Sequence, residues 1–200
     1  MTPTASPRPP ALRIGFVTGV LPDKWARTWR ERHPRDPLDL VPLDPAAAEA
    51  SLRAGEVDMV LVRGPVDREG LHRIPLYQEV PVVVVSRDHV VSAYDEIALA
   101  DLGGEQFALG PPDGLVPDVP QLAFPPMTSA EAVEVAAAGT AVVVLPMSVA
   151  RLHHRKDVVA VRVLGLPETE VGLAWLVARD DERTQEFVGV VRGRTARSSR

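Results

Sequence analysis

The chain has 200 residues, which suits one domain or two small lobes, and its 46% hydrophobic and 24% charged content is typical of a globular protein. The net charge of −5 argues against nucleic acid as a direct partner, because a DNA-binding face is normally basic. The absence of cysteine excludes disulfides, thiolate catalysis and Cys-ligated zinc. The N-terminus has no apolar core of a signal peptide, and no apolar run has the length of a membrane-spanning helix.

The first third of the chain alternates short apolar runs with helical segments. The apolar runs predict strands over residues 12–17, 38–42 and 57–62. Two helices are expected between them, one starting at Pro22 and one capped by Asp44 and ending at Gly55. This order predicts a parallel sheet with right-handed crossovers. Ligands of such sheets sit beyond the carboxyl ends of the strands.

The remaining chain predicts a second α/β set. The Thr-x-x-Glu pattern of Thr128 and Glu131 predicts a capped helix that ends at Gly139. Asp180 or Asp181 is expected to cap the last helix. The other expected elements are strands at 80–85, 106–109, 142–145, 158–163 and 171–177, a helical turn at 97–102, and a short helix from Pro146 to His153.

A proline-rich segment interrupts this second set. Residues 110–126 contain six prolines. Because each proline inside a helix costs about 3 kcal/mol, we expect a loop and no regular helix here.

Two stretches carry a resemblance to a known family. One is residues 52–89, LRAGEVDMVLVRGPVDREGLHRIPLYQEVPVVVVSRDH, and the other is residues 131–152, EAVEVAAAGTAVVVLPMSVARL. Both resemble the effector-binding domain of LysR-type transcriptional regulators, which has the periplasmic-binding-protein type 2 fold. The resemblance covers about residues 11–192 and includes no helix-turn-helix. The residues before Leu12 are too few for a three-helix DNA reader.

The resemblance implies an α/β fold of two Rossmann-like lobes joined by two crossover strands, near Ser86 and Gly172. Lobe II is expected to be shortened, because the proline-rich segment stands where the family has a helix and a strand. The expected division is a flexible leader at 1–10, lobe I at 11–86 plus 172–192, lobe II at 87–171, and a flexible tail at 193–200.

The candidate ligand-binding residues follow strand ends or open helices. They are Thr18, Gly19, Arg63, Gly64, Pro65, Met127, Thr128, Ser129, Pro146 and Met147. A hydroxyl near free N–H groups and an arginine suit a carboxylate. Each has a structural alternative: a tight turn at Thr18, a salt bridge from Arg63 to Asp58 or Glu56, helix capping at Thr128, and core packing at Met147.

Other chemistry-bearing residues favour structural roles. Trp25 and Trp29 share a helix face, which favours core or dimer packing over base stacking. His153 and His154 are adjacent, so their side chains diverge on a helix and do not suit one metal ion. No nucleophile motif, phosphate loop or metal triad is visible, and we expect neither catalysis nor a cofactor.

These features favour a bacterial, cytoplasmic binding module. We expect it to hold a small polar or anionic effector, possibly a carboxylate, in a cleft between the lobes. The resemblance implies a homodimer. Because no DNA reader is visible in the sequence, we expect a role in transcription regulation through a partner regulator, without direct DNA or membrane binding. The alternative is an interaction protein whose cleft is vestigial and filled by the proline-rich loop.

Overall fold

The computed structural model describes residues 10–193, and contacts within the chain divide it into two compact units. Among the described residues, unit 1 comprises 10–77 and 170–193, and unit 2 comprises 78–169. The expected leader and tail fall outside the described residues, except for residues 10 and 193. No helix within the described range is both long and apolar enough to span a bilayer.

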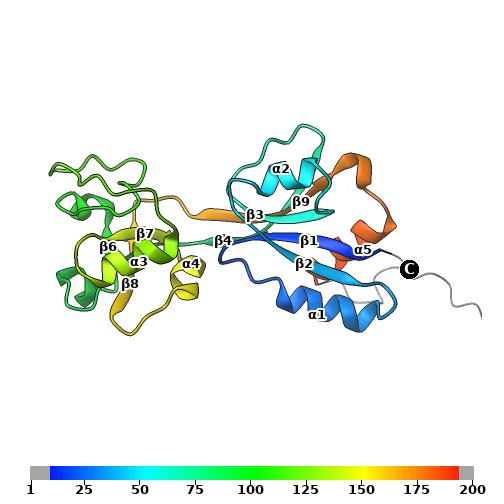
Figure 1. Ribbon diagram of the computed structural model, residues 1–200, viewed down its shortest axis with the longest axis horizontal. Coiled ribbons are helices and arrows are strands. Elements are labelled where there is room, and N and C mark those ends of the chain that lie inside the picture. The colour runs from blue at the N-terminus through cyan, green and yellow to red at the C-terminus, as the bar shows by residue number, and fades with distance from the viewer. Residues whose placement is uncertain (1–9, 194–200) are drawn as a thin grey trace, which may run out of the picture. The chain divides into compact units, whose positions relative to one another are not determined.

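Unit 1 is built on a five-stranded mixed sheet in the order β2-β1-β3-β9-β4 (Figure 1). Its strands are β1 (Leu12–Val17), β2 (Leu38–Leu43), β3 (Met59–Arg63), β4 (Leu71–Glu79) and β9 (Thr169–Leu176). Its helices are α1 (Asp23–Arg32), α2 (Ala48–Arg53), the 3-10 turn η3 (Val177–Arg179) and α5 (Glu182–Val191). β1 runs parallel to β2 and β3, whereas β9 runs antiparallel to β3. The predicted β-α-β-α-β order is thereby confirmed.

Helices cover both faces of this sheet. Figure 1 shows α2 and α1 on opposite sides of the strands, and α1 also contacts α5. At that contact Trp29 is fully buried, with its ring stacked on His33 and edge-on to Phe187. Its indole N–H donates to the carbonyl of Asp36 at 3.0 Å, so its polar atom is satisfied inside the core. The core role expected for Trp29 is therefore confirmed.

Strand β4 was not predicted. The sequence His72-Arg73-Ile74-Pro75 is polar and contains a proline, which argues against a central strand. The sheet order explains the difference, because β4 lies at an edge beside β9. Proline is tolerated on an edge strand, where one side of the backbone needs no partner.

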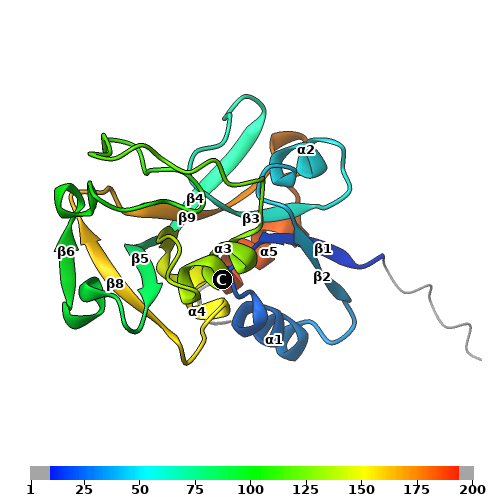
Figure 2. The ribbon, with the colours of Figure 1, turned by 60° about the vertical axis from the view of Figure 1, so that its left-hand side comes forward.

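Unit 2 is built on a four-stranded sheet in the order β6-β8-β5-β7. Figure 2 shows β6, β8 and β5 side by side. Its strands are β5 (Pro81–Ser86), β6 (Glu96–Ala98), β7 (Val143–Pro146) and β8 (Val158–Leu164). Its helical elements are η1 (Val90–Ala93), η2 (Leu99–Leu102), α3 (Ser129–Ala137) and α4 (Met147–Leu152). The chain enters unit 2 after Tyr77, earlier than the expected crossing at Ser86, because β5 pairs with β7 and β8. It leaves after Thr169, before the expected crossing at Gly172.

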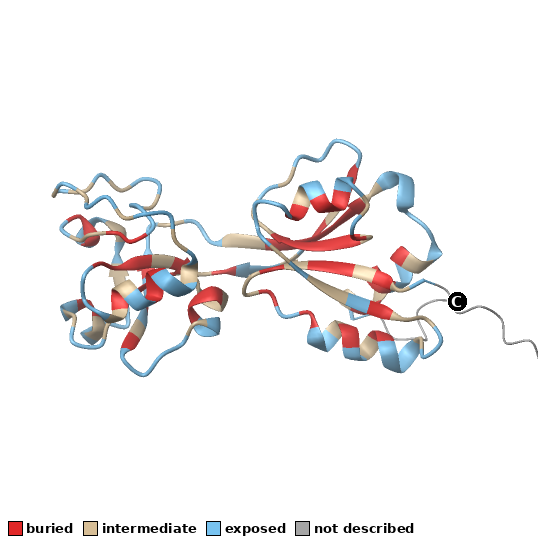
Figure 3. Ribbon diagram, viewed as in Figure 1, coloured by how far each residue is buried: buried red, intermediate tan, exposed pale blue. Residues whose placement is uncertain are grey.

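The four consecutive valines of β5, residues 82–85, are all buried. Figure 3 shows that buried residues gather along the strands in each unit. Because side chains alternate along a strand, Val82 and Val84 pack in one apolar cluster and Val83 and Val85 in another. α3 and α4 contact β5 and so cover the first cluster, whereas η1 contributes to the second. A strand covered on both sides carries a continuous apolar run, which is why the sequence shows no alternation here.

The expected strand at 106–109 is wrong, since only a single bridge joins Phe107 to Val142. The proline-rich loop instead pairs with this segment through glutamine side chains. The amide of Gln121 accepts from the Phe107 N–H at 3.0 Å and donates to the Glu105 carbonyl at 2.9 Å. The side-chain oxygen of Gln106 in turn accepts a hydrogen bond from the Leu122 N–H at 2.7 Å. As predicted, residues 110–126 form no helix, and these bonds order the loop without a strand.

A cluster of charged side chains lies where β1 and β3 begin in the unit 1 sheet. Asp58 accepts from the backbone N–H and guanidinium of Arg13 at 2.8–3.2 Å, and from Arg179 at 3.0 Å. Burial raises the pKa of Asp58, but the hydrogen bonds and charge of Arg13, with the charge of Arg179, outweigh it and lower the pKa. The carboxylate therefore stabilises the fold only while it is ionised.

We predict that Asp58→Asn lowers the free energy of unfolding by about 1–3 kcal/mol at neutral pH. A lowered folded-state pKa means that the wild-type contribution is present above the ordinary value of 3.8 and is lost as the pH falls below it. Urea unfolding at several pH values should therefore show that the free energies of unfolding of the wild type and of Asp58→Asn converge in acid. Asp39→Asn, which changes an exposed carboxylate on β2, is the control and should track the wild type. A difference in the free energy of unfolding between wild type and Asp58→Asn that stays constant into acid would contradict the stabilising role of the ionised Asp58 carboxylate.

Candidate functional site

The loops after β1 and β3 are joined in unit 1. The Arg63 guanidinium, at the end of β3, donates from Nη1 to the Thr18 carbonyl at 3.0 Å. Gly19 and Gly64 have φ angles of 85° and 77°, which L side chains rarely adopt, so both loops turn sharply at these positions. β1 and β3 are parallel neighbours, so this contact lies beyond the carboxyl ends of adjacent strands. Of the predicted residues in this unit, Thr18, Arg63 and Gly64 are thus brought together, with Gly19 and Pro65 next to them in the chain.

A buried arginine on β4 anchors the second of these loops. The Arg73 side chain is only 6% exposed, and its Nη2 donates to the Gly64 carbonyl at 2.9 Å. Its Nη1 pairs with Glu170, whose own carbonyl accepts from the Gly64 N–H at 2.8 Å. Gly64 is therefore held at both its N–H and its carbonyl, and the position of Arg63 beside it is fixed.

Gly172 on β9 makes room for this arginine. A Cβ at Gly172 would lie 2.9 Å from Arg73 Nε and 2.9 Å from the Ile74 carbonyl oxygen, so any side chain would collide with β4. The Nε atom is buried and has no hydrogen-bond partner among residues 10–193. Sequence reasoning missed Arg73, Glu170 and Gly172. The available signal was the glycine within the apolar run 171–177.

In unit 2, Thr128 closes the predicted capping box of α3. Its hydroxyl accepts from the Glu131 N–H at 3.3 Å and donates to the Glu131 carboxylate at 2.8 Å. The same carboxylate accepts from the Thr128 N–H at 2.7 Å. These bonds from the Thr128 backbone and side chain hold the pKa of Glu131 below its ordinary value. The structural alternative for Thr128 is confirmed, and an ionised carboxylate sits at the start of α3.

The other unit 2 candidates lie around one apolar cluster. Met127 and Met147 are half-buried and pack against the cluster that holds Val82 and Val84, so the core role expected for Met147 is confirmed. Pro146 ends β7, and the Met147 N–H donates to the Val80 carbonyl at 3.0 Å. Ser129 opens α3 and is half-buried, and the N–H groups of the first helical turn have no partners within the helix. Ligand contact at these residues stays a prediction, as does their approach to the unit 1 loops.

The histidines do not form a metal centre among residues 10–193, where no group of three or more His, Cys, Asp or Glu residues could hold an ion. His153 is the C-cap of α4 and His154 follows it, exposed. His89 caps η1 through Nδ1, which accepts from the Val91 N–H at 3.3 Å, and its Nε2 lies 3.3 Å from Glu105. The positions of His153 and His154 at the end of α4 match the structural roles that the sequence favoured for them.

Comparisons with known proteins agree with this architecture. The family model described as the LysR substrate binding domain matches residues 7–196. The chain is 36% identical over 100 residues to the Hca operon transcriptional activator HcaR of Escherichia coli (strain K12), a match covering 48% of this chain. The match spans only a third (33%) of that curated relative.

Two solved structures have the same fold. The BenM effector binding domain with its effector benzoate superposes with a TM-score of 0.77 at 20% identity, covering 94% of this chain and 93% of that chain. The reduced form of the OxyR regulatory domain from Pseudomonas aeruginosa gives a TM-score of 0.72 at 20% identity, covering 91% and 97%. At this identity the likeness shows the fold, and it confirms the predicted fold class.

We predict that Glu170→Gln destabilises the protein by about 1–3 kcal/mol, because the buried Arg73 loses its charged acceptor while the side-chain shape is kept. Chemical denaturation measures this loss. Glu168→Gln is the matched control: its carboxylate is 44% exposed and lies 3.5 Å from Arg162, itself 49% exposed. Such a surface pair contributes less than about 1 kcal/mol. Equal losses in the two variants would show that Glu170 does not anchor the arginine.

Proposed function

The chain belongs to the LysR substrate-binding domain family, and on that premise we propose that it binds a small polar or anionic effector and acts in transcription regulation through a partner. The observation that carries the proposal is the contact between Arg63 and the Thr18 carbonyl. It places a fixed positive charge beyond the carboxyl ends of two parallel strands, where α/β sheets bind ligands.

A carboxylate is the effector class that this charge favours. Arginine holds carboxylates through charge-assisted hydrogen bonds, and the anchoring of Gly64 by Arg73 reduces the ordering cost of binding. The BenM domain, described with its effector benzoate, has the same fold and supports the same ligand class. We propose that the function is binding and not catalysis.

An interaction protein is the second candidate. The ordered proline-rich loop exposes Val116 and Leu122, which are 85% and 55% exposed, and Leu109 just before it is 45% exposed. Exposed apolar side chains of this kind occur at protein-protein contacts. This alternative predicts a partner protein and no small-molecule binding at Arg63. A homodimer and a cytoplasmic location remain proposals for either candidate.

We predict that isothermal titration with benzoate and a panel of small carboxylates detects binding, and that Arg63→Ala weakens it about tenfold or more. Arg68→Ala is the control, because Arg68 is exposed in the same connection and its removal changes the net charge equally. No binding of any carboxylate, or equal losses in the Arg63 and Arg68 variants, would contradict the proposal.

A further inference from the structure

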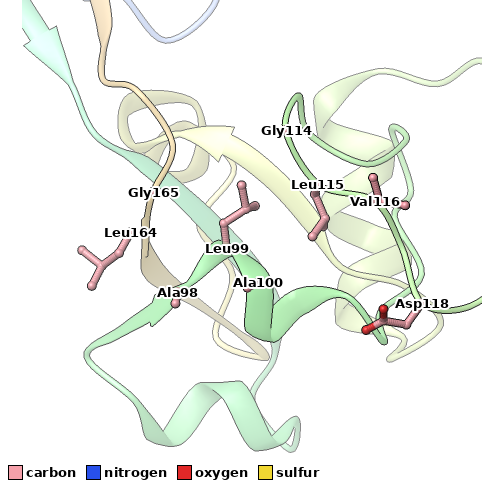
Figure 4. Close-up of a pocket in the computed structure, with 9 residues that line it drawn as sticks. All are labelled: Ala98, Leu99, Ala100, Gly114, Leu115, Val116, Asp118, Leu164 and Gly165. Carbon is pink, nitrogen blue, oxygen red and sulfur yellow. The ribbon is translucent and has the colours of Figure 1, made fainter.

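Unit 2 contains an open pocket of about 640 Å³ that the proposed carboxylate site does not use (Figure 4). Three segments line it: the junction of β6 and η2 (98–100), the proline-rich loop (114–118), and the end of β8 with the residue after it (164–165). Its walls are apolar and include Leu99, Leu115, Val116 and Leu164. A volume of this size accommodates a small organic molecule.

One charged side chain lines the pocket. Asp118 is exposed, and no hydrogen bond or ion pair within residues 10–193 engages its carboxylate. The neighbouring Gly103 is buried, and a Cβ there would lie 2.4 Å from Asp118 Oδ2. The Asp118 N–H also donates to the Gly103 carbonyl at 2.7 Å. The bare backbone of Gly103 thus lets the carboxylate lie close against the end of η2.

The loop wall of the pocket is fixed before any ligand binds. Leu115 packs against the apolar cluster that holds Val83 and Val85. Gln121 bonds to the backbone of residues 105 and 107, and Gln106 donates to the Pro120 carbonyl at 3.0 Å. A wall ordered in this way adds little entropy cost to binding.

We propose that this pocket binds a small molecule that combines an apolar body with one protonated amine. The apolar body contacts Leu99, Leu115 and Leu164, and the ammonium group pairs with Asp118. The charge preference is opposite to that proposed for Arg63, and every residue of the pocket lies in unit 2. The inference therefore stands independently of the carboxylate site.

The pairing is modest because the carboxylate is exposed to solvent. Screened surface pairs change affinity by up to about fivefold, so we expect weak binding. Affinities of this size are suited to two-dimensional NMR of the ¹⁵N-labelled full chain.

The test is a titration with 2-phenylethylamine, beside the neutral 2-phenylethanol and the anionic 3-phenylpropanoate. The amide signals of Leu99, Val116 and Gly165 should shift, and affinity should fall in the order amine, alcohol, carboxylate. Asp118→Asn should weaken amine binding about threefold to fivefold and leave the alcohol unchanged. Asp113→Asn removes an exposed carboxylate of the same loop that does not line the pocket, and should change nothing.

A second variant measures the contribution of apolar contacts to binding separately from that of the Asp118 charge. Val116 is 85% exposed, so Val116→Ser leaves folding intact and should weaken the amine and the alcohol alike. Three outcomes would overturn the proposal. They are equal affinity for the amine and the carboxylate, equal effects of the Asp118 and Asp113 variants on amine binding, and no shift of these amide signals up to about 10 mM amine. Arg63→Ala must leave the amine titration unchanged, and Asp118→Asn must leave benzoate binding unchanged, so either proposal can fail alone.

Discussion

The buried guanidinium of Arg73 imposes the constraint on which the unit 1 loops depend. A charge with 6% of its side chain exposed must find acceptors inside the protein. It finds them in the Gly64 carbonyl and the Glu170 carboxylate, and it fits only because Gly172 has no side chain. Residues from β4, β9 and the loop after β3 are therefore fixed by one group.

This constraint extends to the residues proposed to bind ligand. Gly64 is held at both its N–H and its carbonyl, so Arg63 beside it has a defined place, and Arg63 in turn holds the Thr18 carbonyl. None of these contacts requires an effector. The arrangement is thus preorganised, which is the property that lets a small anion bind without ordering a loop. Unit 2 presents carboxylates instead, at Glu131 and at Asp118, so the two units favour ligand groups of different charge.

Local patterns in the sequence predicted much of this fold. The strands β1 and β3, the valine run of β5 and the capping box of α3 depend on neighbours within a few residues. β1 and the capping box lie at the expected residues, whereas β3 and β5 begin slightly later than expected, at Met59 and Pro81. β4 was missed because its polar residues and Pro75 make sense only at the sheet edge beside β9, far along the chain. The strand at 106–109 was wrong because a side chain, Gln121, takes the place of a neighbouring strand. The anchor of the candidate site joins Arg73 to Glu170, and such distant pairs leave no local pattern.

We propose that the loops after β1 and β3 form one anion-binding surface. A two-dimensional NMR titration of the labelled chain with benzoate tests this most directly. The amide signals of Thr18, Gly19 and Gly64 should shift together along one saturable curve, and this curve should be lost in Arg63→Ala. Shifts confined to other parts of the chain, or a saturable curve that survives in Arg63→Ala, would contradict it.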